Sequence, residues 1–190
     1  MGQYFKAVLA KGNTEKFAKR NIIAVFSPYD YDNGAKLMEH SYIKNELVGV
    51  VTDEIRKQGG CRLRWTGDYA ENNVDVRGVE DQSELGNLYS LTDDMEKKGA
   101  KWSKKVPRYI INESNKEFVD VKKCRKDKYG YTIHPMPLLC CDSNGQGGGD
   151  YYADNGQQYV GSWTGDIISV SDEAPEGYTE IVPDFFEGDE

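Results

Sequence analysis

The sequence predicts an α+β fold, namely a single domain with a mainly antiparallel sheet and one or two helices. The length of 190 residues suits one domain. Residues 41–58 have the spacing of an amphipathic helix, whereas most other apolar runs are short and bounded by Gly, Pro or Asn, as strands are. Helical and extended patterns do not alternate regularly enough to predict a parallel sheet built from βαβ units.

Local patterns predict the individual elements. Apolar residues recur every three or four positions in the helix at 41–58, and Gly59 and Gly60 follow it as a C-terminal cap would. A second helix is predicted from about residue 83 to 98, ending at Gly99. Strands are predicted at residues 3–9, 21–27, 62–65, 138–141, 158–163 and 167–170, and a hairpin at 108–112 and 117–121 around Asn115.

Composition narrows the class of protein. Hydrophobic residues make up 38% of the chain and charged residues 29%, which is too apolar for a wholly disordered protein. We find no apolar run of about 20 residues and no signal peptide, and we expect a cytoplasmic protein without membrane contact. The 4 cysteines form no CxxC pair, so we expect reduced thiols rather than a zinc site. The oligomeric state is left open.

Charge is distributed unevenly. Residues 171–190 contain eight acidic residues and no Lys or Arg, while residues 97–128 contain twelve Lys or Arg and four acidic residues. We expect a domain over residues 1–182 followed by an acidic tail at 183–190. The apolar residues near the tail predict that residues 178–182 pack against the body, and that the acidic end shields the basic segment.

The glycine-rich stretch at residues 137–170 is the most unusual part of the sequence. Three consecutive glycines indicate a tight turn or a close approach of the backbone. Consecutive backbone N–H groups can also cradle a phosphate, although no P-loop pattern follows. The candidate ligand-binding residues are therefore Asn144, Gly147, Gly148, Gly149 and Asp150.

The same stretch contains oxygen ligands for a divalent cation. It matches an EF-hand calcium loop only in part, because Ala153 stands where a bidentate Glu is required. The tetrapeptide Trp-Thr-Gly-Asp occurs at 65–68 and again at 163–166, which predicts two similar turns on adjacent strands with both tryptophans buried. The candidate metal ligands are therefore Asp142, Asn144, Asp150, Asp68 and Asp166. Turns in which Asp and Asn bond their own backbone are the simpler alternative.

Neither histidine, His40 or His134, has a local catalytic signature, so structural roles are expected for both. The basic segment at 97–128 mixes aromatic residues with cations, as nucleic-acid-binding surfaces do. Its candidate phosphate contacts are Lys101, Lys104, Lys105, Lys122, Lys123, Arg125 and Lys126. The acidic total charge of the chain argues against this interpretation.

Five motifs resemble a family of small proteins from phages and bacteria. They are MGQYFKAV at the start, NGAKLMEHS at 33–41, RWTGDYA at 64–70, SNGQGGGDY at 143–151 and VGSWTGD at 160–166. The family typically starts with MGQYY and has GDYAD-like and NGRGGGD…VGSWAGD-like boxes, with no established activity. The resemblance implies a mobile-element context, and it does not extend to the basic segment or the acidic tail.

Two functions follow as hypotheses. The first is a non-enzymatic phage or mobile-element accessory protein that binds a host protein, one form being an inhibitor of a bacterial defence system. It requires no cofactor. The alternative is a small metal- or nucleotide-dependent hydrolase centred on the loop from Asp142 to Asp150, which would use a divalent cation.

Overall fold

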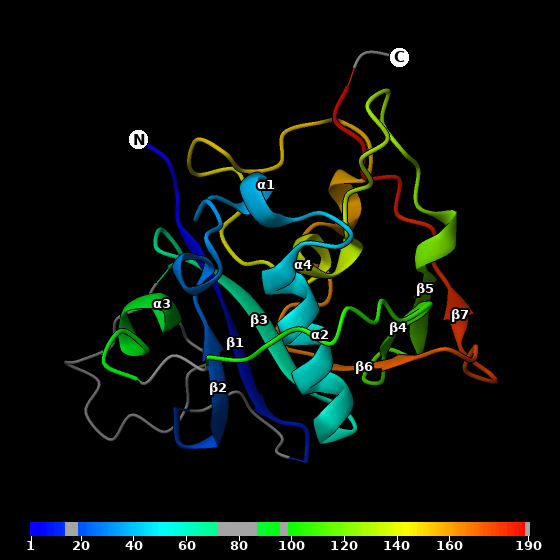
Figure 1. The fold of residues 1–190 in the computed structure, drawn as a ribbon, viewed down its shortest axis with the longest axis horizontal. Coiled ribbons are helices and arrows are strands. Elements are labelled where there is room, and N and C mark those ends of the chain that lie inside the picture. The colour runs from blue at the N-terminus through cyan, green and yellow to red at the C-terminus, as the bar shows by residue number, and fades with distance from the viewer. Residues whose placement is uncertain (14–18, 72–86, 96–98, 189–190) are drawn as a thin grey trace.

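The computed structural model describes residues 1–13, 19–71, 87–95 and 99–188. Its centre is one seven-stranded sheet in the order β2-β1-β3-β6-β4-β5-β7, shown in Figure 1. All neighbouring strands pair antiparallel except β5 and β7. The predicted α+β class with a mainly antiparallel sheet is therefore confirmed. The strands are β1 (Phe5–Lys11), β2 (Ile22–Phe26), β3 (Cys61–Gly67), β4 (Tyr109–Asn112), β5 (Glu117–Asp120), β6 (Ile167–Ser171) and β7 (Thr179–Glu180).

The longest described helix, α2, confirms the helix predicted near residues 41–58. It begins later than predicted, because the Asn45 side chain caps it by accepting a hydrogen bond from the Val48 N–H. It ends where predicted, at Gly59 in the left-handed conformation. The described α-helices are α1 (Leu37–His40), α2 (Glu46–Gln58), α3 (Leu88–Leu91) and α4 (Pro135–Leu139).

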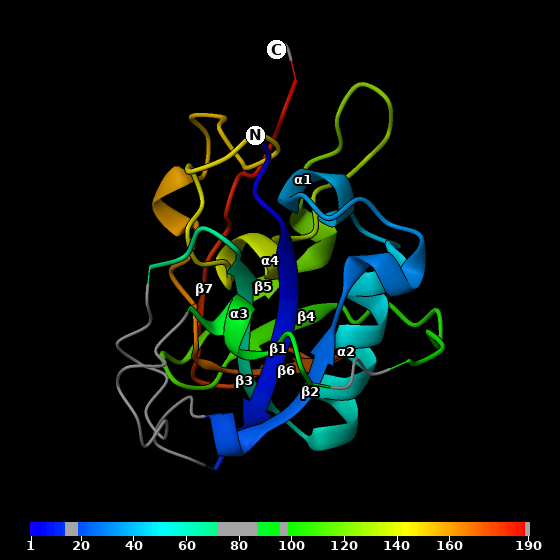
Figure 2. The same cartoon turned by 90° about the vertical axis from the view of Figure 1, so that its left-hand side faces the viewer.

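Strand β1 is buried on both of its faces because both are covered. Alternate residues face opposite sides of a strand. Phe5, Ala7 and Leu9 belong to the main core together with the buried face of α2. Val8 belongs to a smaller core together with Leu88 of α3. Helices α2 and α3 accordingly lie on opposite sides of β1, as Figures 1 and 2 show.

The sheet has two well-paired halves joined by a short pairing. Strands β1 and β3 pair along seven residues, from Phe5–Gly67 to Lys11–Cys61. Strands β4 and β6 pair along four residues. The connection between the halves is β3 with β6, where only Cys61–Ile168 and Arg62–Ile167 are paired.

Two predicted strands are wrong, and one helix differs in extent. Leu138 and Leu139 are the last residues of helix α4, Cys140 is its C-cap, and Cys141 forms only an isolated bridge with Trp65. The helix begins at Pro135 after a His134 cap, a position that proline favours. Residues 158–163 form a 3₁₀ helix (Gln157–Tyr159) and turns. Of the helix predicted at 83–98, only Leu88–Leu91 is helical in the described part, and the predicted ends at 83–86 and 96–98 lie outside the described residues.

The C-terminal segment confirms the expected packing of residues 178–182. Strand β7 pairs with β5, and the Ile181 N–H donates to the Phe118 carbonyl at 2.9 Å. Packing continues further than predicted, because Phe185 is only 4% exposed and belongs to the main core. Its ring meets the Tyr151 ring edge-on at 5.5 Å. The packed body therefore extends past the expected boundary at residue 183.

Candidate functional site

The glycine-rich loop binds a carboxylate of its own chain. Asp150 Oδ2 accepts hydrogen bonds from the backbone N–H groups of Gly145, Gln146 and Gly147 at 2.8, 3.0 and 3.0 Å. The Asp150 side chain is buried. Successive N–H groups in this arrangement form an anion-binding concavity. The loop thus has the geometry predicted for a phosphate-binding site, but the Asp150 carboxylate occupies it.

The three consecutive glycines allow the N-terminal segment to pass close to this loop. The Gly148 N–H donates to the Met1 carbonyl at 3.2 Å, and Gly2 forms a bridge with Gly148. A Cβ atom on Gly147 would come within 2.6 Å of the Gln3 backbone nitrogen. Gly149 has a φ of 86°, which favours glycine. The glycines are explained by this close approach.

Asn144 and Asp142 are also engaged within the chain. The Asn144 side chain pairs with the backbone of Tyr151, accepting from its N–H at 2.8 Å and donating to its carbonyl at 3.0 Å. Asp142 Oδ1 accepts from the Gly67 N–H at 3.0 Å, and its Oδ2 lies 3.6 Å from the Arg64 guanidinium. Burial raises the pKa of Asp142. These contacts join the loop to the end of β3.

The two Trp-Thr-Gly-Asp copies do not bring their aspartates together. Both tryptophans are fully buried, as predicted. The Gly165 N–H donates to the Leu63 carbonyl, and the Leu63 N–H donates to the Asp166 carbonyl, so the second copy lies beside Leu63. Asp68 is five residues further along the chain, which in a strand corresponds to about 17 Å.

Asp68 and Asp166 therefore have separate partners. Asp68 Oδ1 accepts from the Tyr4 N–H at 2.9 Å, and Asp166 Oδ2 accepts from the Asn112 amide at 2.8 Å. Among the described residues, no group of three or more His, Cys, Asp or Glu side chains is placed to hold a metal ion. The structure thus does not assemble the predicted cation site from Asp142, Asp150, Asp68 and Asp166.

Both histidines have structural roles. His40 Nδ1 donates to the Gly34 carbonyl at 2.9 Å, and its Nε2 accepts from the Trp65 indole at 2.8 Å. His134 Nδ1 accepts from the Met136 N–H at 3.2 Å and so caps α4. Burial lowers the pKa of His40 to about 4 and that of His134 to about 3, so both are neutral at pH 7.

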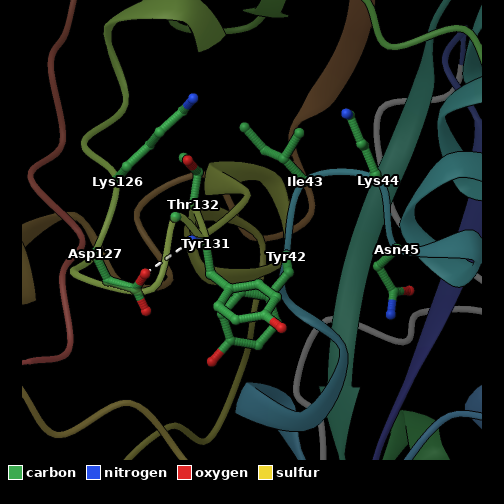
Figure 3. Close-up of a pocket in the computed structure, with 9 residues that line it drawn as sticks. Tyr42, Ile43, Lys44, Asn45, Lys126, Asp127, Tyr131 and Thr132 are labelled. Carbon is green, nitrogen blue, oxygen red and sulfur yellow. Dashed lines mark hydrogen bonds between the residues drawn. The ribbon is translucent and has the colours of Figure 1, made fainter.

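A groove on the surface is the strongest candidate for a binding site. It consists of two adjoining cavities of about 740 and 810 Å³ that share Ile43, Lys44, Lys126 and Thr132. Figure 3 shows Lys126 and Lys44 on either side of Ile43 and Thr132, with the Tyr42 and Tyr131 rings close together. The second cavity continues to Val106, Pro107, Arg108, Val121, Lys122, Cys124 and Asp172.

The groove is held together by backbone contacts between distant segments. The Ile43 N–H donates to the Thr132 carbonyl at 2.9 Å, and Tyr42 forms a bridge with Ile133. Asp127 Oδ1 accepts from the Tyr129 N–H at 2.9 Å and from the Tyr131 N–H at 2.7 Å, which fixes the loop beside the groove. The Tyr42 and Tyr131 rings meet edge-on at 6.1 Å. Contacts within the chain thus fix the segments that form this end of the groove.

Three lysines in the groove have no counter-ion within the described part of the chain, namely Lys44, Lys122 and Lys126. Lys44 also has a φ of 71°, a conformation that non-glycine residues rarely adopt and that often occurs at functional sites. The fourth cation, Arg108, is bound to Asp120 at 3.0 Å, and this bond lowers the pKa of Asp120. Three of the four cations are therefore available to a ligand.

Alternate residues of the basic segment have different environments. Lys122, Cys124 and Lys126 line the groove. Lys123 and Arg125, which alternate with them, bind the C-terminal segment: Lys123 Nζ lies 2.5 Å from Glu180, and Arg125 Nε lies 3.2 Å from Asp184. The predicted contact of the acidic end with the basic segment is therefore present, but these two ion pairs involve Lys123 and Arg125 rather than lysines that line the groove.

Sequence reasoning found part of the groove. The sequence predicts phosphate contacts at Lys122 and Lys126, but it predicts a helix for Tyr42, Ile43 and Lys44. Charge and aromatic content pointed to residues 97–128, but no pattern in the sequence indicates that residues 42–45 lie beside them.

The described helices include no membrane span, since the longest, α2, has 13 residues and is too short and polar to cross a bilayer. Comparison of the chain with models of protein families, with curated proteins and with solved structures gave no match in any of the three.

Proposed function

We propose that this protein is a non-enzymatic binding protein that acts on a protein of a bacterial host, in a phage or mobile-element setting. One form of such a role is inhibition of a bacterial defence system. The observation that carries the proposal is the preformed groove, in which Lys44, Lys122 and Lys126 lack a counter-ion among the described residues. In a chain with a net charge of −8, a local group of unpaired cations is a specific feature that a partner can recognise.

The groove combines charge with apolar surface, as protein-binding sites do. Ile43, Val106 and Pro107 provide apolar contact area, and Tyr131, whose side chain is 63% exposed, adds an aromatic ring. Tyrosine is enriched at protein interfaces because it joins a large apolar surface to a polar group. By contrast, the side chains of the glycine-rich loop are engaged within the chain, so no observation favours the hydrolase alternative.

The test is a comparison of host proteins captured by three forms of the protein. The groove variant is Lys122→Glu/Lys126→Glu. The matched control is Arg20→Glu/Lys57→Glu, which makes the same charge change at two exposed residues that do not line the groove. We expect at least one host protein to be captured by the wild type and the control and to be lost with the groove variant.

Two outcomes would contradict the proposed function. Identical capture by all three forms would remove the groove from the proposal. A rise in Tm with a divalent cation or a nucleotide, accompanied by hydrolysis of that nucleotide, would overturn it in favour of the hydrolase, because ligands that bind the folded state raise its stability.

A further inference from the structure

The C-terminal segment shows how this protein holds an acidic, aromatic peptide. Asp184 forms an ion pair with Arg125 at 3.2 Å, and the same guanidinium lies 3.7 Å from the centre of the Phe186 ring. Such a cation can attract both a carboxylate and the face of an aromatic ring. Glu180 adds a second ion pair, to Lys123. One side of the basic segment is thus occupied by two acidic residues, Glu180 and Asp184, and one aromatic residue, Phe186.

The other side of the same segment has the same chemistry without an occupant from the described chain. Lys122 and Lys126 line the groove together with Lys44, and the Tyr131 ring and Ile43 provide aromatic and apolar surface. Resting on the proposed function, we propose that the groove binds an acidic segment of the partner protein that carries an aromatic residue among its carboxylates. Such a segment would complement the groove as residues 180–186 complement the opposite side.

The charges at the two ends of the groove favour a short peptide over a nucleic acid. Asp127 lines the cavity at the tyrosine end, and Asp172 lines the cavity at the Arg108 end. A strand of nucleic acid carries a charge at every nucleotide and would leave the groove past these carboxylates. The net charge of −8 adds a repulsive field over the rest of the molecule. A peptide can place its carboxylates at the lysines alone.

The probe for the test is a fluorescein-labelled peptide with the sequence of residues 181–190, which is both acidic and aromatic. Two matched peptides replace either all its Asp and Glu by Asn and Gln, or both Phe by Ala. Fluorescence anisotropy should show that the parent peptide binds the full-length protein about tenfold more tightly than either matched peptide. The variant Lys122→Gln/Lys126→Gln should lose that difference, whereas Arg20→Gln/Lys57→Gln should retain it.

Other outcomes overturn the inference. Binding that survives Lys122→Gln/Lys126→Gln but is lost with Arg125→Gln would mean that the peptide replaces the protein's own tail. Lysine-dependent binding of labelled oligo(dT), with none of the peptide, would assign the groove to nucleic acid. If no peptide binds while lysine-dependent capture of a host protein persists, the acidic-peptide chemistry fails and the proposed function stands. Circular dichroism melting of each variant confirms that the comparisons are made on folded protein.

Discussion

The glycine-rich loop and the basic groove both attract negative charge, but only one of them is filled by its own chain. In the loop, three backbone N–H groups surround the Asp150 carboxylate. In the groove, Lys44, Lys122 and Lys126 form no ion pair with a carboxylate of the described residues. The comparison teaches that an unusual sequence can mark a place where the chain binds itself, while a binding site can arise where ordinary residues are left unpaired.

The largest effect should come from removing the internal anion of the loop. Asp150→Ala removes the charged acceptor of three backbone N–H groups, of which that of Gly147 is buried, so we expect the free energy of unfolding to fall by about 4 kcal/mol. For a chain of this size the corresponding decrease in Tm is roughly 10 °C. Asp154→Ala, four residues later and exposed, is the control and should melt like the wild type. If Asp150→Ala had only a small effect on stability, the Asp150 carboxylate would not be needed to fill the loop, and the contrast between the loop and the groove would fail.

The docked tail should matter almost as much. Phe185 is 4% exposed, and replacing a buried Phe by Ala typically costs about 3 kcal/mol. Chemical denaturation of Phe185→Ala should show this loss, whereas deletion of residues 188–190 should leave the midpoint unchanged. The result would show that the side of the basic segment that binds the C-terminal tail contributes to stability, in contrast to the groove. Equal stability of Phe185→Ala and wild type would mean that the tail is not part of the core in solution.

Acid should lower the free energy of unfolding through the two buried histidines, whereas the described residues that line the groove include no histidine. The unfolded state takes up protons on His40 and His134 near pH 6.5, whereas the folded state does so only at about 4 and about 3. Folded pKa values below the unfolded value mean that stability falls as the pH decreases through 6.5. The loss between pH 7.5 and 5.5 should be about 2.5 kcal/mol for the two groups together. Urea unfolding at several pH values measures it, and a flat profile would contradict buried neutral histidines.

The smallest effect on stability is expected from the groove itself. Lys122→Gln/Lys126→Gln removes two cations that have no counter-ion among the described residues, so the free energy of unfolding should change by less than about 0.5 kcal/mol. Differential scanning calorimetry of the variant measures this change. A loss above about 1 kcal/mol would show that the lysines are structural and would end the contrast with the loop.

Much of the fold could be predicted because its signals are local. The apolar spacing of α2 and the glycine after it are visible in the sequence, as are the two strands around Asn115 that became β4 and β5. The start of α2 could not be placed, because Ile43 continues the helical spacing but lines the groove, where its N–H bonds to the Thr132 carbonyl. A tertiary contact overrides the pattern there.

The wrong strand at residues 138–141 has a similar cause. Leu138 and its neighbours are apolar and close to prolines, which favours an extended interpretation. In the structure the prolines occupy the first turn of α4, where no backbone N–H is needed, and His134 supplies the cap. Pro135, which directly follows the capping residue His134, is the feature of the sequence that could have indicated the start of a helix.

The candidate site could be predicted only in part. The sequence correctly indicates close backbone approach at Gly147, but it does not show that the approaching groups are Gln3 and the Asp150 carboxylate. Lys122 and Lys126 stand out by charge, whereas Lys44 becomes relevant only when residues 42–45 pair with 132–133. Contacts between segments so far apart in sequence leave no periodic pattern.

The late pairing of one edge of β3 has a consequence during synthesis of the chain, because this edge is exposed in the nascent protein. All described partners of this edge of β3, namely residues 140–142, residues 165–166 and β6, are synthesised long after β3, and until then its backbone groups lack them. Open strand edges template association between chains, and charged side chains along them oppose it. Arg62 and Arg64 lie on β3 and supply such charges. Residues 140–142 bond to Trp65 on this edge, and residues 165–166 bond to Leu63. Chains that end before residue 140 lack all of these partners and keep the edge open, so we expect these truncated products, rather than the full-length chain, to aggregate.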